Sequence, residues 1–245
     1  MNMVESNNIV KNYYDDFSNR QQKMGVNERH RAIMDLLKKA GLSKEDSVLE
    51  FGCGIGTQSS LLLKYLNKEG SLTAIDLSPK SVGIARNRLS KYSNASFIAP
   101  DFTTWNANEK FDAIVMADVL EHIPMEIHSK LFANINAHLK LNGFAGINIP
   151  NPHFQDFCKN KGMEMQIIDL SIHIEDLIKN LQGSGLYLHE FKKYSVWNKE
   201  GDYQFMVLRK KQYQTLFHPV HKHKSIVKKI REKVQYEHHK LKKRK

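Results

Sequence analysis

The most constraining feature of the chain is a glycine-rich segment, Val48-Leu49-Glu50-Phe51-Gly52-Cys53-Gly54-Ile55-Gly56-Thr57. An apolar run ends there in a carboxylate, alternating glycines follow, and a helix-like segment from Ser59 to Leu66 comes next. Glycines at these positions let the backbone turn sharply and approach a ligand closely, because they carry no Cβ. The segment therefore predicts a strand, a tight loop and a helix N-terminus that together hold a nucleoside-type cofactor.

Two acidic residues narrow the choice of cofactor. Glu50 lies two residues before Gly52, where a carboxylate would repel a pyrophosphate but would suit a cationic ligand. Asp76 ends the next apolar run, about twenty residues beyond the last glycine, where ribose hydroxyls are usually bound. A nucleoside that carries a sulfonium and an amino acid suits both acids. The two residues predict S-adenosyl-L-methionine as the cofactor.

Three later segments continue the pattern in the same order. Ala99-Pro100-Asp101-Phe102 looks like the end of a third strand, the run from Phe111 to Pro124 like a fourth strand and its following motif, and the run from Leu141 to Pro150 like a turn and fifth strand. On these motifs the chain resembles the class I S-adenosylmethionine-dependent methyltransferases over roughly residues 10–210.

The resemblance implies roles for individual residues. Glu50 would lie near the methionine end of the cofactor, or merely cap the glycine turn. Asp76 would accept both ribose hydroxyls. Asp101 would accept the adenine amino group with Phe102 beside the ring, or cap a helix. Tyr14 resembles part of a lid, although packing on the body is an alternative. The implied cofactor-binding residues are Tyr14, Glu50, Gly52, Gly54, Gly56, Asp76, Leu77, Asp101, Phe102, Ala117 and Asp118, the last two beneath the sulfonium.

Strand-like and helix-like segments alternate from residue 28 onward. This order predicts an α/β, Rossmann-like fold with a seven-stranded, mostly parallel sheet, helices on both faces and a C-terminal β-hairpin. We expect an N-terminal lid segment over 1–27, the cofactor-binding methyltransferase domain over 28–211 and a basic tail over 212–245. Within the domain we expect helices over 28–39, 79–89 and 125–139, strands over 48–51, 71–76 and 112–117, and a hairpin of 186–197 with 203–210.

The positive charge of the chain belongs mainly to its tail. Of the formal net charge of +11, residues 218–245 carry eleven Lys and Arg against two acids, or +9, which leaves +2 for the rest. Such a nearly neutral body argues against a nucleic-acid-binding protein. Apolar residues at helical spacing indicate a basic amphipathic helix over 224–242. This tail is a solvated appendage, a contact with an anionic membrane surface or membrane-bound partner, or, with least support, a nucleic-acid contact.

Nothing in the sequence predicts export. No secretory leader and no run of eighteen apolar residues is present, and the two cysteines, Cys53 and Cys158, suit a reducing compartment. We therefore expect a cytoplasmic enzyme, peripheral at the inner membrane face if the tail binds there.

Three histidines are candidate general bases for a hydroxyl acceptor. His122 follows the fourth strand and His153 the fifth, and ligands of open α/β sheets bind at these carboxyl ends. His173 lies in the insertion before the sixth strand, from which the family often builds its acceptor pocket. Each could instead be structural, and the sequence predicts no metal site.

The acceptor is predicted less directly. The segments that contain these histidines look like methyltransferases of bacterial surface-polysaccharide and natural-product pathways. The prediction is O-methylation of a sugar hydroxyl on a glycan or nucleotide-linked sugar. The alternatives are a small-molecule O- or N-methyltransferase acting on a natural product or quinone, an RNA methyltransferase, and a non-catalytic methyltransferase-like subunit.

Overall fold

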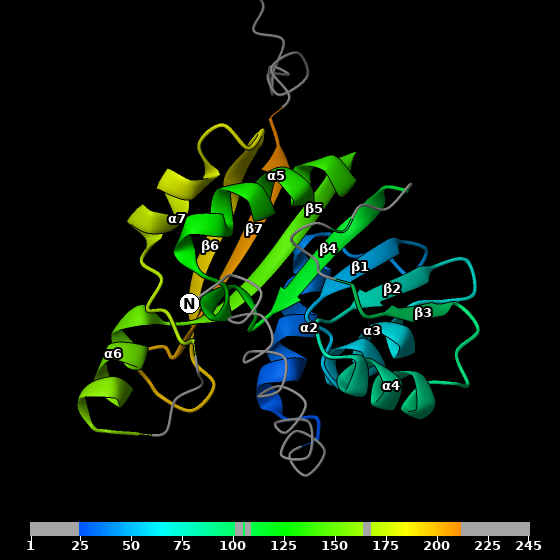
Figure 1. The fold of residues 1–245 in the computed structure, drawn as a ribbon, viewed down its shortest axis with the longest axis horizontal. Helices are drawn as coiled ribbons and strands as arrows, with labels where there is room; N and C mark the ends of the chain where they lie inside the picture. Colours follow the sequence, from blue (N-terminus) through cyan, green and yellow to red (C-terminus); the bar gives the residue numbers. More distant parts are fainter. Residues whose placement is uncertain (1–24, 101–104, 106–108, 164–167, 212–245) are drawn as a thin grey trace, which may run out of the picture. The chain divides into compact units, whose positions relative to one another are not determined.

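The computed structural model describes residues 25–100, 105, 109–163 and 168–211. Seven strands form one sheet in the order β3-β2-β1-β4-β5-β7-β6 (Figure 1). The first five strands pair in parallel, and β7 is antiparallel to both of its neighbours. The predicted mostly parallel sheet with a C-terminal hairpin is confirmed. The strands are β1 (Ser47–Phe51), β2 (Ser71–Ile75), β3 (Ala95–Ile98), β4 (Phe111–Ala117), β5 (Leu139–Pro150), β6 (Leu186–Tyr194) and β7 (Tyr203–Lys210).

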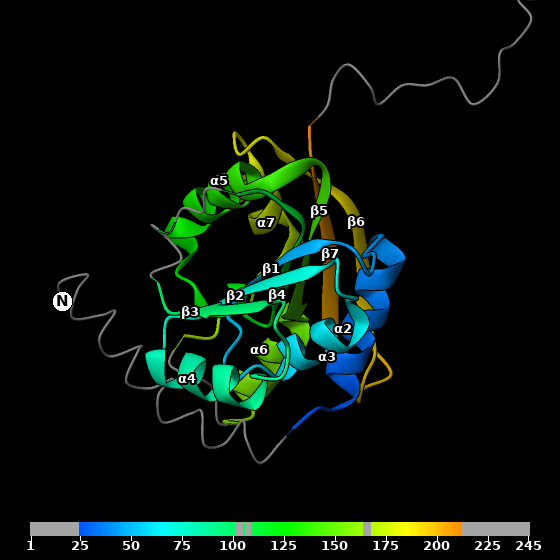
Figure 2. The ribbon, with the colours of Figure 1, turned by 90° about the vertical axis from the view of Figure 1, so that its right-hand side faces the viewer.

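Helices cover both faces of the sheet (Figure 2). One layer contains α2 (Glu28–Ala40), α3 (Thr57–Tyr65) and α4 (Pro79–Arg88), and the other contains α5 (His128–His138) and α7 (Ile174–Leu181). A further helix, α6 (Pro152–Asn160), begins directly after β5. Among the described helices, none combines the length and apolarity that crossing a bilayer requires.

The two layers follow from alternation along the strands. In β1, Val48 packs with α2, α3 and α4, whereas Leu49 and Phe51 pack with the opposite layer. Successive side chains of a strand point to opposite faces, so an apolar strand with helices on both sides builds two cores. By the same alternation Glu50 falls on the α3 face, which places its carboxyl group under the glycine loop.

Several predicted boundaries were wrong. The expected helix over 125–139 begins as a 3-10 turn (Met125–Ile127), and Leu139 already belongs to β5. The first hairpin strand stops at Tyr194 instead of residue 197, because the following backbone N–H groups bind the Asp202 carboxylate instead of continuing the ladder. The predicted Tyr14, Asp101 and Phe102 contacts and the basic tail lie outside the described residues.

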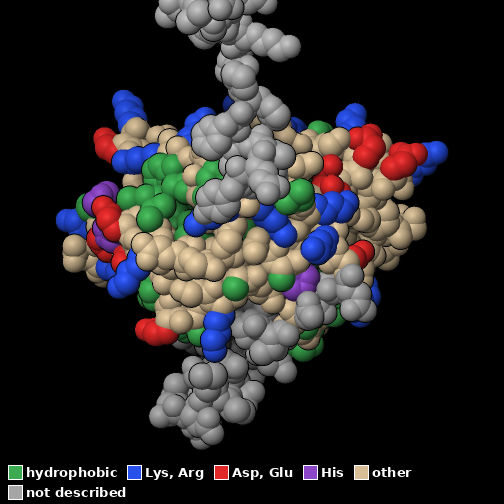
Figure 3. Space-filling view, turned by 90° about the horizontal axis from the view of Figure 1, so that it is seen from above, with side chains coloured by type: hydrophobic (Ala, Val, Ile, Leu, Met, Phe, Trp, Pro, Cys, Tyr) green, Lys and Arg blue, Asp and Glu red, His purple; other side chains and the backbone are tan. Residues whose placement is uncertain are grey.

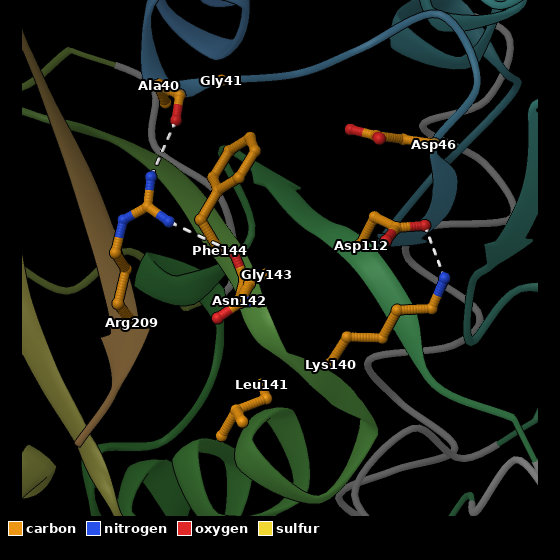
Figure 4. A pocket seen from close by; sticks show the side chains of 10 residues that line it. All are labelled: Ala40, Gly41, Asp46, Asp112, Lys140, Leu141, Asn142, Gly143, Phe144 and Arg209. Atoms are coloured by element: carbon orange, nitrogen blue, oxygen red, sulfur yellow. Dashed lines mark hydrogen bonds and ion pairs between the residues drawn. The ribbon is translucent and has the colours of Figure 1, made fainter. Parts of the chain in front are cut away.

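A cavity of about 300 Å³ opens at the amino ends of the parallel strands (Figure 4). Arg209 donates hydrogen bonds to the carbonyl oxygens of Ala40 (3.0 Å) and Asn142 (3.3 Å), and Lys140 Nζ lies 2.7 Å from Asp112 Oδ2. These contacts join the end of α2 to the start of β5 and to β7. The cavity therefore lies at the edge opposite the glycine loop, and its polar groups connect neighbouring helices and strands.

Two glycines test the packing of the sheet against its helices. A Cβ on Gly146 would lie 2.6 Å from Leu37 Cδ2, whereas a Cβ on Gly83, inside α4, would have no atom within 4 Å. We expect Gly146→Ala to lower the free energy of unfolding by about 1 to 3 kcal/mol through overpacking. The matched Gly83→Ala should raise it by about 0.5 to 1 kcal/mol, because alanine is favoured in a helix. Denaturant unfolding measures both, and equal effects would contradict the packing described.

Candidate active site

The glycine loop has the conformation that its sequence predicts. Gly52, Gly54 and Gly56 have φ values of 69°, 52° and 81°, which favour glycine. A Cβ on Gly52 would lie 2.4 Å from Val119 Cγ2, and one on Gly56 would lie 2.9 Å from Leu89 Cδ1. The loop therefore passes too close to its neighbours for larger residues, and it leads directly into α3.

Glu50 lies buried at the end of β1, with 1% of its surface exposed. Its Oε2 accepts a hydrogen bond from Ser59 Oγ of α3 at 2.6 Å. Burial raises the pKa of Glu50 to about 7; the Ser59 hydrogen bond opposes this rise, and the nearby charge of Asp76 adds to it. A cationic ligand beside this carboxyl group would favour its ionised form.

Asp76, directly after β2, is held by backbone donors on both oxygens. The Gly54 N–H donates to Oδ2 at 2.8 Å, and the Ser78 N–H donates to Oδ1 at 2.9 Å. The first contact fixes the carboxylate against the glycine loop, and the second ties it to the N-cap of α4. Leu77 occupies the turn between them and is half-buried. The carboxylate thus has a defined orientation beside the loop.

Asp118 follows β4 in a conformation that non-glycine residues rarely adopt. Its φ is 57°, the sole positive value for a non-glycine residue within the described segments. Asn148 of β5 binds both the backbone and the side chain of Asp118. The Asn148 carbonyl accepts the Asp118 N–H (2.9 Å), and Asn148 Nδ2 donates to Asp118 Oδ1 (2.7 Å). Ala117, the preceding residue, is half-buried at the end of β4. The strained backbone directs the Asp118 carboxylate to the carboxyl edge of the sheet.

Arg29 and two tyrosines complete the surroundings of Asp118. Arg29 Nε, from the first turn of α2, lies 3.0 Å from Asp118 Oδ2, and its guanidinium contacts the hydroxyl group (3.4 Å) and ring of Tyr203. Tyr194 donates to Asn148 Oδ1 at 2.7 Å. Sequence reasoning missed these partners, since α2, β6 and β7 come together only in the fold. The polar Asn148 within the apolar run from Phe144 to Pro150 was the one signal available.

Glu121 and His122 form a buried pair after β4. The Ile168 carbonyl accepts a hydrogen bond from His122 Nδ1 at 2.6 Å, so in the neutral ring Nε2 holds the lone pair. Burial lowers the pKa of His122 and keeps the ring neutral at pH 7. Glu121 Oε1 lies 3.8 Å from Nε2, and burial together with the charges of Asp118 and Asp169 raises the Glu121 pKa.

The other two candidate histidines lie together on the surface. The ring centroids of His153, in α6, and His173, before α7, are 5.5 Å apart. His153 is exposed, and His173 Nε2 lies 3.9 Å from Asp156 Oδ2 with 41% of its side chain exposed. In the part of the chain that the structure describes, no three His, Cys, Asp or Glu side chains are grouped as a metal site would require.

The residues at the glycine loop fit the predicted cofactor. A buried carboxyl group at the end of β1 suits an ammonium group, and an oriented carboxylate after β2 suits a pair of ribose hydroxyls. A pyrophosphate would meet two acids there and would be repelled. The donor set therefore favours a cationic nucleoside.

The segment that contains the glycine loop and the two acids matches a known protein family. Residues 48–143 match the protein-family model described as a methyltransferase domain. These residues form a methyltransferase domain. They span the glycine loop, both acids and the strand that ends at Asp118. The cofactor of this domain is S-adenosyl-L-methionine.

The curated relatives match about half of this chain, whereas the similar solved structures match most of it. Trans-aconitate 2-methyltransferase from Escherichia coli O7:K1 is 28% identical over 124 residues, which are 51% of this chain and 47% of that enzyme. The chain thus spans about half the length of the curated relatives that it matches first. A methyltransferase structure from Clostridium acetobutylicum ATCC 824 has a TM-score of 0.63 at 16% identity, covering 82% of this chain and 99% of that one. The N-methyltransferase NodS from Bradyrhizobium japonicum WM9 has a TM-score of 0.58 at 24% identity, covering 76% and 96%. Both share the fold.

The methyltransferase domain should bind its cofactor in a pH-dependent way. Glu50, with a pKa of about 7, is largely protonated at pH 6 and ionised at pH 8. Because a cationic ligand requires the carboxylate, we expect the affinity for S-adenosyl-L-methionine to fall about tenfold from pH 8 to pH 6. Calorimetric titration measures this fall. Glu50→Gln should bind weakly and lose most of the pH dependence; an unchanged slope in that variant would assign the titration to another group.

Proposed function

We propose that the protein transfers the methyl group of S-adenosyl-L-methionine to a sugar hydroxyl on a glycan or nucleotide-linked sugar. The observation that carries this proposal is the His122 tautomer, with its lone pair on Nε2 at the carboxyl edge of the sheet. A hydroxyl group is a weak nucleophile until it loses its proton, and a neutral imidazole is a suitable base for that step. A carboxylate acceptor would need no such base.

The charge of the site also favours an uncharged acceptor. The carboxylates of Asp118 and Asp169 lie near His122, and Arg29 is paired with Asp118. An anionic acceptor, such as the one named for the trans-aconitate enzyme, would approach acids with little compensating charge. Hydroxyl groups can instead donate to these carboxylates. This argument supports a polyhydroxylated acceptor over a tricarboxylate.

In this mechanism the chain positions groups and moves one proton. When bound, S-adenosyl-L-methionine supplies the methyl group on an electrophilic sulfonium. Glu50 and Asp76 hold the amino-acid and ribose ends, and His122 Nε2 takes the proton of the attacking hydroxyl group. The carboxylates around His122 stabilise the imidazolium that forms. His153 and His173, which lie at the surface, then take no part in proton transfer.

Replacing the base should separate chemistry from binding. We expect His122→Gln to lower turnover by about two to four orders of magnitude and leave the affinity for S-adenosyl-L-methionine within about twofold. In the wild type, kcat/KM should fall on the acid side with a midpoint below pH 6.5, because the His122 pKa is lowered. His153→Gln is the matched control. Full activity in His122→Gln together with a loss in His153→Gln would transfer the role of base to His153.

RNA is a less favoured acceptor. On the face seen in Figure 3, which looks onto the amino ends of the parallel strands, Lys and Arg side chains are interspersed with Asp and Glu instead of forming one basic surface. Nucleic-acid-binding proteins usually present a continuous basic surface along the path of the phosphates. The basic charge of this protein is concentrated in residues 218–245.

We propose that this tail brings the enzyme to an anionic membrane face, where lipid-linked glycans would be accessible.

Truncation tests the tail. A variant that ends at Lys211 should keep its cofactor affinity and its activity on a soluble acceptor, and should lose binding to phosphatidylglycerol vesicles. In the full-length protein, raised salt should weaken the same binding, because screening acts on the charges that truncation removes. Vesicle sedimentation measures both effects. Binding that survives truncation would place the membrane contact on the body instead.

A further inference from the structure

The turn between β6 and β7 is built around one buried carboxylate. Asp202 has no exposed surface, and its two oxygens accept the N–H groups of Val196 (2.7 Å) and Trp197 (3.0 Å). Charge-assisted hydrogen bonds of this kind hold a backbone firmly. Ser195 Oγ adds a bond to the Lys199 carbonyl at 3.1 Å. The backbone that carries Trp197 is therefore fixed.

The same turn is joined to the candidate active site. The Asn151 N–H donates to the Asp202 carbonyl (2.8 Å), and the Asn151 side chain donates to the Gly201 carbonyl (2.6 Å). Asn151 also caps α6, where its Oδ1 accepts the His153 N–H. In Figure 1 the turn lies at the end of the sheet where β4 also ends. Trp197 thus stands at the edge that contains the acceptor-side residues.

Trp197 is exposed although its backbone is fixed. The residue is 58% exposed, and its ring meets Tyr203 edge to face with centroids 5.7 Å apart. Tyr203 in turn contacts Arg29, the partner of Asp118. An indole on a fixed backbone and beside Tyr203, with much of its surface in water, loses less conformational entropy when a ligand covers it than an indole on a mobile loop would lose.

The surroundings of Trp197 indicate which ligand would fit. Exposed polar side chains, Ser195, Lys199 and Glu200, share its turn. An apolar face with a hydrogen-bonding rim matches a pyranose, whose C–H groups line the ring faces and whose hydroxyl groups line the rim. The positive edges of C–H bonds are attracted to the negative face of an aromatic ring. A lipid or a large aromatic acceptor would instead require a continuous apolar surface.

We infer that Trp197 is a stacking subsite for a second sugar ring of the acceptor, next to the sugar that is methylated. This inference rests on the proposed function and deepens it, because it makes the acceptor a glycan of at least two rings. Trp197 then contributes to acceptor affinity and takes no part in proton transfer.

Fluorescence provides a direct test. The chain has two tryptophans, so in a Trp105→Phe background Trp197 is the sole tryptophan and can be excited selectively over the tyrosines. With S-adenosylhomocysteine present, titration with cellobiose, chitobiose and lactose should shift its emission saturably for at least one disaccharide. Glucose, galactose and N-acetylglucosamine should bind more weakly. If none of the three disaccharides shifts the emission, or if UDP alone saturates the shift, the inference is wrong.

Variants complete the test. We expect Trp197→Ala to weaken binding of the responding disaccharide about tenfold by calorimetry, and Trp197→Phe to restore part of it. Phe157→Ala is the matched control, since Phe157 of α6 is 54% exposed; it should change nothing. Equal affinity in wild type and Trp197→Ala overturns the subsite. Glycan methylation without a Trp197 response would refute the subsite alone, whereas disaccharide binding without methylation would refute the proposed function alone.

Discussion

The carboxyl edge of the sheet depends on burying polar groups that are each matched by a partner. Glu50, Asn148 and Asp202 are at most 1% exposed, and the side chain of each forms a hydrogen bond with another element or turn: Glu50 with α3, Asn148 with the residue after β4, and Asp202 with the turn after β6. An unmatched buried carboxylate or amide would cost several kcal/mol, so these contacts determine how the strands end relative to one another. Without them the loops that follow β1, β4 and β5 would have no fixed direction.

The burial of Glu50 lowers the stability of the folded protein at neutral pH. Its pKa rises from an ordinary 4.5 to about 7, so the folded protein holds a proton that the unfolded chain would release. The protonated carboxyl group is tolerated below pH 4.5, and the folded state loses stability as the pH rises from there to about 7. The loss amounts to about 3 kcal/mol for a shift of this size. A cationic cofactor would recover much of it, which couples stability to cofactor binding.

The cofactor half of the molecule was predictable because its signals are local. Glycine spacing, Glu50 and Asp76 lie within one stretch of chain, and strand alternation placed them on the sheet. The surroundings of Asp118 were not predictable, since Arg29, Asn148 and Tyr203 come from separate elements whose meeting depends on the order of strands. Sequence likewise could not show that Asp202 ends β6 three residues early. The family-model match ends at residue 143, so Asn148 and Tyr203 lie outside the matched residues.

The two arginine contacts of α2 and β7 have a geometric consequence. Arg29 meets Tyr203 at one end of this pair of elements, and Arg209 meets Ala40 at the other. The two helix residues are about 17 Å apart along the axis, and the two strand residues are about 20 Å apart along β7. The helix and the strand therefore span similar lengths between the two contacts. If one residue were inserted in either element, only one of the two arginine contacts could form. The contact between Arg209 and Ala40 at the amino edge therefore helps to set the position of Arg29 beside Asp118.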